Sequence, residues 1–189
     1  MSVLSDSIAG VQTEAVEEQV VEPELKTGSG GEPPTPPVSI WGESEKPLAL
    51  ISDIDHTIVF PSPDREFMDF SKSENDFPNP PVIRAIKEWY LSTESPTIYF
   101  VTNRAVGWHD VTIRWLVKYF SPAQYRWVLR MRPPNDFFST PAMIKEQHLI
   151  NEIGKKCTVQ QVWEDDDECI AMYQKYGLDV HDAKETWPQ

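Results

Sequence analysis

Apolar runs of strand length alternate with longer amphipathic stretches along residues 47–189. The apolar runs cover 48–52, 97–101, 126–130 and 159–163, and the helix-like stretches cover 80–91, 108–120, 141–153 and 167–177. Strands that alternate with helix-length patterns are typical of a parallel sheet. We therefore predict an α/β fold, an open three-layer parallel sheet with helices on both faces.

Polar residues follow these apolar runs where the strands are expected to end. Asp53 and Asp55 follow the first run, Thr102 follows the second, and Glu164 with Asp165 follows the last. Ligands of open α/β sheets bind at the carboxyl ends of the strands, so we expect these side chains to converge there. Because a buried carboxylate is unfavourable unless it is paired or holds a metal, the grouping indicates a nucleophile, an acid/base and a metal site.

Each of these features also has a plainer structural interpretation. Two acids after a strand more often end that strand and cap the next helix than catalyse a reaction. The acidic run 164–168 is typical of the first turn of a helix, and we expect Asp167 and Glu168 to have only that role. Lys145 has the plain interpretation of an exposed helix lysine. The occurrence of all the features in one chain favours the site.

Their order resembles the four motifs of the haloacid dehalogenase superfamily. Asp53-Ile54-Asp55-His56-Thr57 is similar to motif I, D-x-D-x-T after a hydrophobic strand. Thr102-Asn103-Arg104 resembles motif II, Lys145 stands in the place of motif III, and Glu164-Asp165 stands in the place of the acidic motif IV. Within residues 48–182, further stretches resemble the phosphatase domain of phage-type polynucleotide kinase, namely 65–70, 76–82, 112–116, 129–133 and 172–178. The segment between motif I and residue 80 is too short for a separate cap domain, so we expect a capless or minimally capped core.

The residues and the resemblance lead to the same chemical roles. Phosphoryl transfer requires a nucleophile, a proton for the leaving oxygen and neutralisation of the phosphoryl oxygens. We predict Asp53 as the nucleophile, which forms an aspartyl-phosphate, and Asp55 as the acid that later acts as a base. Thr102 would hold the phosphoryl oxygens, and Lys145 would cancel the charge that the phosphate and the carboxylates share.

Magnesium is the expected cofactor. It suits a site with few carboxylates, a phosphate group and waters. The predicted ligands are Asp53, the main-chain carbonyl of Asp55 and acids of motif IV. Two acidic pairs fit motif IV, Glu164-Asp165 and Asp165-Asp166, and the spacing to the helix that follows favours Glu164 and Asp165.

Substrate binding is expected from motif II and from basic residues near the same sheet edge. The predicted residues are Thr102, Asn103, Arg104, Arg130 and Arg132. The planar fork of arginine suits a neighbouring phosphate or the plane of a base. Motif II differs from the Ser-Gly-Arg that is usual in the phosphatase domains this chain resembles. His56 replaces a glycine that many members carry, which is strained if the position needs a positive φ, although histidine tolerates it better than a branched residue.

Composition divides the chain near residue 46. Residues 1–46 hold 9 of the 30 acidic residues and 2 of the 17 basic ones, with runs of Gly and Pro, so we predict a disordered acidic tail, either a tether or a segment that binds an unknown protein partner. Residues 47–189 form the predicted phosphatase domain. With 21 acidic and 15 basic residues, this domain is itself acidic, which argues against a strong electrostatic grip on nucleic acid.

Other sequence signals concern the compartment. Cys157 and Cys169 have no histidine at metal-ligand spacing, which favours a reduced, intracellular protein. We find no apolar stretch long enough to span a bilayer and no signal peptide pattern. A cytoplasmic location is expected, in the host cytoplasm if a phage encodes the chain. No phosphate-loop motif of a kinase half occurs in the sequence.

The sequence therefore predicts a magnesium-dependent phosphomonoesterase that acts on nucleotides or on the 3′-phosphate ends of nucleic acid. Two alternatives stay open. One is a phosphatase of the same superfamily for an unrelated small phosphoester. The other is a binding or structural protein that keeps the fold and has lost turnover. The presence of both Asp53 and Asp55 argues against the second alternative.

Overall fold

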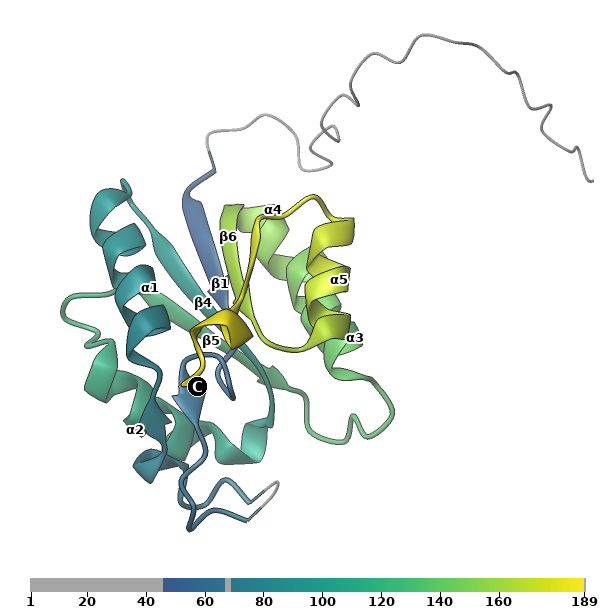
Figure 1. The fold of residues 1–189 in the computed structure, drawn as a ribbon. Helices are drawn as coiled ribbons and strands as arrows, with labels where there is room; N and C mark the ends of the chain where they lie inside the picture. Colours follow the sequence, from purple (N-terminus) through teal and green to yellow (C-terminus); the bar gives the residue numbers. More distant parts are fainter. Residues whose placement is uncertain (1–45, 67–68, 189) are drawn as a thin grey trace, which may run out of the picture. The chain divides into compact units, whose positions relative to one another are not determined.

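The computed structural model describes residues 46–66 and 69–188 (Figure 1). The predicted tail, apart from Lys46, lies outside the described residues. The central sheet has five strands in the order β5-β4-β1-β6-β7, and every neighbouring pair is parallel. Its strands are β1 Leu48–Ser52, β4 Thr97–Ala105, β5 Trp127–Arg132, β6 Thr158–Glu164 and β7 Val180–Asp182.

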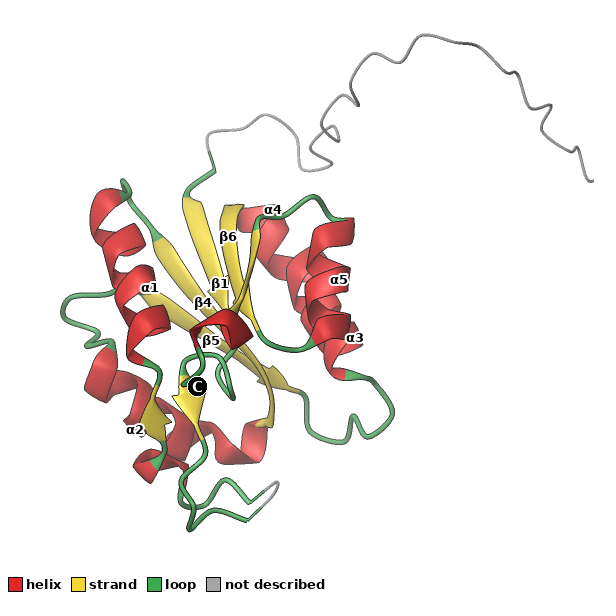
Figure 2. Ribbon diagram, in the orientation of Figure 1, coloured by secondary structure: helices red, strands yellow, loops and turns green. Residues whose placement is uncertain are grey.

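Helices flank this sheet on both faces (Figure 2). They are α1 Pro80–Ser92, α2 His109–Tyr119, α3 Pro141–His148, α4 Gly154–Lys156 and α5 Asp167–Lys175, and a π-helical turn, Leu149–Ile153, joins α3 to α4. Short 3₁₀ turns cover Ser73–Asn75, Val106–Trp108 and Ala183–Thr186. Within the described ranges, no helix has both the length and the apolar character needed to cross a bilayer.

The three layers follow from side-chain alternation in β1. Leu50 belongs to one core with residues of α1 and α2, and the buried residues of this core include Ile86 and Trp115. Its neighbours Ala49 and Ile51 belong to a second core with Leu149 and residues of α5. Because successive strand residues point to opposite faces, a central strand that is apolar from Leu48 to Ile51 must be covered on both sides. The predicted three-layer α/β fold is confirmed.

A small two-stranded antiparallel sheet lies outside this core. It pairs β2, Val59–Phe60, with β3, Phe77–Pro78, and the chain between these two strands forms an insertion between β1 and α1. The ion pair of Arg65 with Asp55 at 3.2 Å places the described part of this segment beside the loop that follows β1. This insertion fits the expected minimal cap.

The structure differs from the predicted elements at several places. Neither β7 nor the β2–β3 pair has a counterpart in the prediction, because strands of two or three residues are too short to show a periodic signal. The predicted helix 141–153 is interrupted at His148, where the π-helical turn begins. Strand β4 does not end before Thr102 but continues to Ala105, with a register shift against β5 between Val101 and Ala105.

The strand order places the site. From β1 the chain proceeds through β4 to β5 on one side, and it then returns through α3 to β6 on the other side of β1. The connections after β1 and β6 thus leave in opposite directions. This is the topological switch point at which α/β sheets bind ligands, and Asp53 and Glu164 lie there.

Candidate active site

A cluster of three carboxylates, two of them buried and one half-buried, lies at the switch point. Asp53 comes directly after β1, Glu164 is the last residue of β6, and Asp165 follows it. One carboxylate oxygen of each lies within 4.8 Å of the others. The Lys145 Nζ donates to Asp53 Oδ1 and to Glu164 Oε2, both at 2.7 Å. Lys145 is therefore part of the site and not an exposed helix lysine, since it is 3% exposed.

Local structure explains how these side chains meet. The backbone N–H of Asp53 donates to the carbonyl of Trp163 at 2.9 Å, which continues the β1–β6 pairing and sets the first acid beside the second. Helix α3 begins with Pro141 and is capped by Thr140, whose hydroxyl accepts from the backbone N–H of Met143 at 3.3 Å. The cap fixes the start of the helix, and Lys145 reaches the acids from its second turn.

Burial controls the charges in this cluster. It raises the pKa of Asp53 above its usual range, and the positive charge of Lys145 only partly offsets the effect. Burial also raises the pKa of Glu164. Burial, together with the negative charge of Asp53, raises the pKa of Asp165 to about 6. Burial disfavours the charge of Lys145 as well, but Asp53 and Glu164 outweigh it, so the pKa of Lys145 lies above its usual value.

The cluster fits a divalent cation such as Mg²⁺. All three acids offer oxygen ligands, which hard cations prefer. When ionised, they carry three negative charges against the single positive charge of Lys145. The two remaining charges are those that one divalent ion would neutralise. The carboxylate of Asp55 lies outside this group, so its predicted metal contact rests on its main-chain carbonyl alone.

The loop after β1 is held by residues on both sides. Thr57 donates its hydroxyl proton to Asp165 Oδ1 at 2.9 Å, which links motif I to motif IV. The Asn79 side chain donates to the carbonyl of Thr57 at 2.8 Å. His56 has a φ of 61°, so the residue that replaces glycine does occupy the left-handed region. The Trp187 indole donates to the carbonyl of His56 at 2.9 Å and holds this strained residue in place.

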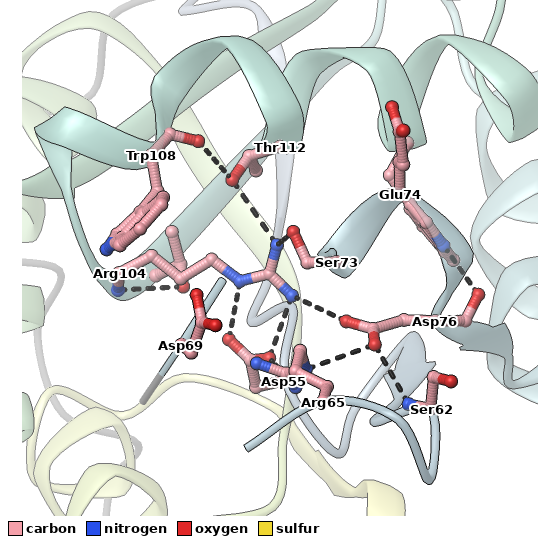
Figure 3. Close-up of polar contacts among 12 residues, drawn as sticks. Asp55, Ser62, Arg65, Asp69, Ser73, Glu74, Asp76, Arg104, Trp108 and Thr112 are labelled. Atoms are coloured by element: carbon pink, nitrogen blue, oxygen red, sulfur yellow. Dashed lines mark hydrogen bonds and ion pairs between the residues drawn. The ribbon is translucent and has the colours of Figure 1, made fainter. Parts of the chain in front are cut away.

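Asp55 lies in a different environment from Asp53. The Arg104 guanidinium binds it through two parallel hydrogen bonds, and Arg65 Nη2 donates to its Oδ1 at 3.2 Å. Asp76 contacts both guanidinium groups, at 3.1 Å from Arg65 Nε and 3.5 Å from Arg104 Nη2. Figure 3 shows the Arg104 guanidinium at the centre of these contacts.

The N–H groups of the Arg104 guanidinium donate to other side chains of the protein. Its Nε and Nη2 face Asp55 and Asp76, and its Nη1 donates to the hydroxyl oxygens of Ser73 and Thr112 at 3.2 and 3.3 Å (Figure 3). The buried guanidinium therefore orients Asp55. Burial alone would raise the pKa of Asp55, but the hydrogen bonds and charge of Arg104, with the charge of Arg65, hold it below its usual value.

A cleft opens beside Asp55. Its volume is about 390 Å³, and its lining is Asp55, His56, Pro61, Arg65, Glu66, Phe70, Asn103 and Arg104. The Phe70 ring forms part of the wall and lies against the guanidinium groups of Arg65 and Arg104, at 4.7 and 4.8 Å from the ring centroid. Asp55 is thus the acid that a group in the cleft would meet, whereas Asp53 faces the acidic cluster.

Comparisons with known proteins identify the family of the chain. The family model of the phosphatase domain of polynucleotide kinase matches residues 47–186. The chain belongs to this family. A protein of Autographa californica nuclear polyhedrosis virus, named as a bifunctional polynucleotide kinase/RNA ligase, is 28% identical over 129 residues, which are 68% of this chain and 18% of the relative.

Solved structures show the same fold. A chain of the Pnkp1/Rnl/Hen1 RNA repair complex matches with a TM-score of 0.65 and 24% identity, covering 74% of this chain and 43% of that one. A second structure of the Pnkp1/Rnl/Hen1 complex matches with a TM-score of 0.65 and 23% identity, covering 77% of this chain and 50% of that one. The chain thus spans less than a fifth of the viral relative and half or less of each solved chain.

The observed positions of the residues can now be compared with the site that the sequence predicted for this member of the polynucleotide kinase phosphatase family. The structure brings Asp53, Lys145, Glu164 and Asp165 together. Thr102 is buried in β4, where its hydroxyl accepts from the backbone N–H of Arg104 at 3.2 Å.

The other predicted arginines have partners within the protein. Arg130 forms an ion pair with Glu152 and also donates to the carbonyl of Leu129. Arg132 Nε donates to Asn103 Oδ1 at 2.8 Å, and its other nitrogens donate to two carbonyls of the loop after β5. A role of Arg130 or Arg132 in substrate binding stays a prediction.

Three residues of this family member were not predicted as part of the site. Arg65 and Asp76 orient Asp55 and Arg104, and Thr57 binds Asp165. Arg65 and Asp76 lie in the irregular insertion, which has no periodicity that could place them. Their signal in the sequence was the resemblance of stretches 65–70 and 76–82 to the family. Thr57 belongs to motif I, but spacing alone gave it no partner.

Proposed function

We propose that this chain is a magnesium-dependent phosphomonoesterase that removes the 3′-phosphate from nucleic-acid ends through an aspartyl-phosphate on Asp53. The observation that carries the proposal is the different setting of two acids two residues apart. Asp53 lies against Lys145 in the acidic cluster. Asp55 is bound by the guanidinium groups of Arg65 and Arg104, which we call the arginine cage, and it lies beside an open cleft. A nucleophile and an acid/base for the leaving group need such separate settings.

In the first step, an oxygen of Asp53 attacks phosphorus, and the bond from phosphorus to the sugar oxygen breaks. Asp55 gives its proton to that leaving oxygen. Lys145 and Thr102 neutralise and hold the phosphoryl group. Mg²⁺, when bound by Asp53, Glu164 and Asp165, supplies further neutralisation of the phosphoryl charge.

In the second step, Asp55 takes a proton from water, and the water oxygen attacks the phosphorus of the aspartyl-phosphate. The bond between phosphorus and Asp53 breaks, which releases phosphate and regenerates the carboxylate. The low pKa of Asp55 in the free protein keeps its carboxylate ionised, which is the form that can accept this proton. For the first step, Asp55 must be protonated. The negative charge of an incoming phosphate raises the pKa of Asp55 and so favours its protonated form.

The cleft beside Asp55 supports a nucleoside as the leaving group. Its volume of about 390 Å³ and its apolar surfaces, contributed by Pro61 and Phe70, suit a sugar with its base. The family match and the nucleic-acid repair complexes among similar folds point to the same class. Arg104 is proposed as a positioning residue for Asp55 and not as a direct phosphate ligand.

A substrate panel tests the proposal. Purified protein with Mg²⁺ is given an oligonucleotide with a 3′-phosphate, the same oligonucleotide with a 5′-phosphate, a nucleoside 3′-monophosphate and several sugar phosphates. We expect the highest kcat/KM on a 3′-phosphate and none after EDTA or with Asp53→Asn. Preference for a sugar phosphate would favour the unrelated-phosphoester alternative. Binding of the 3′-phosphate oligonucleotide without turnover of any compound would favour the silent binding protein.

A further inference from the structure

Two adjacent phenylalanines are exposed on the segment 133–140 between β5 and α3. Phe137 is 81% exposed and Phe138 is 96% exposed, more than any other large apolar side chain in residues 46–66 and 69–188. Single exposed apolar residues are common in soluble proteins and need no explanation. Two phenylalanines that are adjacent in the sequence and both face solvent indicate a contact with another molecule.

Hydrogen bonds give this segment a defined shape. Arg132 donates from Nη1 to the carbonyl of Asp136 at 2.8 Å and from Nη2 to the carbonyl of Ser139 at 3.0 Å. The Asp136 carboxylate accepts from the backbone N–H of Ser139 at 3.0 Å, and this bond holds the pKa of Asp136 below its usual value. The two phenylalanines lie between these anchor points, so the segment presents them outward.

Both ends of the segment are attached to elements of the site. At one end Arg132 binds the side chain of Asn103, which lines the cleft and follows Thr102. At the other end Thr140 caps α3, the helix that carries Lys145. The segment leaves β5 at the carboxyl edge of the sheet, the same edge at which β1 and β6 deliver their acids (Figure 1).

We propose that Phe137 and Phe138 form a stacking platform for the bases next to the 3′-terminal nucleotide of the substrate strand. The inference rests on the proposed function and makes it specific, because it requires a single-stranded nucleic acid of more than one nucleotide. Aromatic side chains stack on bases of any sequence, since every base has a π face. Stacking also needs no positive charge, and the domain is acidic overall, with 21 acidic and 15 basic residues from residue 47 onward.

A protein partner fits these two rings less well. A stable protein interface buries about 800 Å² on each partner, whereas the apolar feature consists of two side chains, with Met143 on α3 as a further exposed apolar residue. One or two bases cover an area of the size that two phenyl rings offer. The platform therefore suits a flexible strand whose terminal phosphate is held in the site.

The test compares substrates of increasing length in matched variants. The double variant Phe137→Ala/Phe138→Ala removes both rings, and Phe137→Trp/Phe138→Trp keeps a stacking surface. Leu91→Ala is the control, because Leu91 is 75% exposed on α1, outside the site. For each protein, kcat/KM is measured on a nucleoside 3′-monophosphate and on 3′-phosphorylated oligonucleotides of two, three and ten nucleotides, with and without abasic sites before the terminal nucleotide.

We expect wild type, the Trp variant and Leu91→Ala to prefer the oligonucleotides over the monophosphate. The Ala variant should lose at least about 5-fold in the ratio of these kcat/KM values, the lower end of what one stacked base contributes. Abasic sites should reduce the wild-type ratio of kcat/KM values by the same factor as the Ala substitutions do. They should leave the ratio of the Ala variant unaltered. An unchanged ratio in the Ala variant would overturn the platform while the phosphatase assignment stands. Failure of wild type to hydrolyse any 3′-phosphate would overturn both.

Protein association is a separate outcome of the same variants. If Phe137→Ala/Phe138→Ala changed the mass of the protein in solution by light scattering and left the substrate ratio unaltered, the rings would contact a second copy of the chain. That result also contradicts the platform.

Discussion

Arg104 binds Asp55 through two parallel hydrogen bonds, Nε to Oδ2 and Nη2 to Oδ1, each at 2.8 Å. A bidentate pair of this kind fixes the plane of the carboxylate as well as its position. Asp76, whose side chain is fully buried, contacts the same guanidinium from the other side. The orientation of the acid at the cleft is therefore built by residues that contact no substrate in the proposed mechanism.

Substitution of Arg104 tests this positioning role. Arg104→Lys keeps a positive charge but lacks the planar fork, so Asp55 should lose its fixed orientation. We expect kcat on an alkyl phosphate to fall about 100-fold, the lower end of what acid/base catalysis contributes, and kcat on an aryl phosphate to fall much less. Arg114→Lys is the control, since Arg114 is an exposed residue paired with Glu74. Equal losses on both phosphates, with an unchanged thermal midpoint, would contradict the role.

The two acids of motif I should be separable by the leaving group. Asp53→Asn removes the nucleophile and should abolish turnover of every phosphoester. Asp55→Asn removes the proton donor, which matters less when the leaving group is a stabilised phenolate, so it should retain more activity on an aryl phosphate than on an alkyl phosphate. Steady-state rates of both variants on the aryl and the alkyl phosphate test these two roles. Wild-type rates for Asp53→Asn would rule out the aspartyl-phosphate.

The sequence predicted four of the five strands of the large sheet and all three acids of the cluster because these depend on local patterns. An apolar run followed by acids identifies a central strand and its carboxyl end, and parallel pairing then brings Asp53 and Glu164 together. Lys145 was identified only with the help of the resemblance, since no periodicity distinguishes a buried lysine from an exposed one. The helix cap at Thr140 and the length of α3 decide that it points inward.

The contacts of Arg65, Asp76 and Arg104 around Asp55 could not be predicted from the sequence, for a physical reason. Arg65 and Asp76 lie 10 and 21 residues after Asp55, in an insertion whose described residues form β2, β3 and a 3₁₀ turn. Their positions are set by long-range contacts, such as the bond from the Ser62 N–H to Asp76 Oδ1 at 2.9 Å. Spacing carries no information on such contacts. The partners of Arg104 within the protein could not be foreseen from spacing either.

Removal of the tail is expected to leave the chemistry intact. Residues 1–44 are acidic and rich in Gly and Pro, so they lack the apolar residues needed for a core. Deleting them should leave kcat on an aryl phosphate and the thermal midpoint unchanged within experimental error. Both values are measured against the full chain in the same buffer. A clear fall in either would mean that part of this segment packs on the domain.

Metal binding should depend on pH through the acidic cluster. Metal ions bind the deprotonated carboxylates, so they must displace any proton on Asp165, whose pKa burial raises to about 6 in the free protein. The rise in thermal midpoint caused by Mg²⁺ should therefore be larger at pH 8 than at pH 5. Asp165→Asn should abolish most of the rise. Asp167→Asn, which alters an exposed acid of the same run, should keep it.

The ion pair of Arg130 with Glu152 separates a structural role from the predicted substrate role. Hydrogen bonds from Arg130, and then from Lys156, lower the pKa of Glu152 from 4.5 to about 2. A carboxyl group whose pKa is lower in the folded state stabilises the protein above its unfolded pKa, and that stabilisation is lost as the pH falls through the folded pKa. Glu152→Gln should therefore lower the free energy of unfolding at pH 7 by about 1 kcal/mol, as for a partly exposed pair.

Urea unfolding of wild type and Glu152→Gln at pH 7, 4 and 3 measures this effect, and the difference between them should shrink as the pH falls below about 4.5 and towards 2. The companion variant Arg130→Met should show a similar loss of stability at pH 7, because it breaks the same pair. If Arg130 serves only this pair, the variant retains kcat/KM on a 3′-phosphate oligonucleotide. A fall in kcat/KM on the oligonucleotide but not on an aryl phosphate would instead place Arg130 against a neighbouring phosphate, as the sequence predicted.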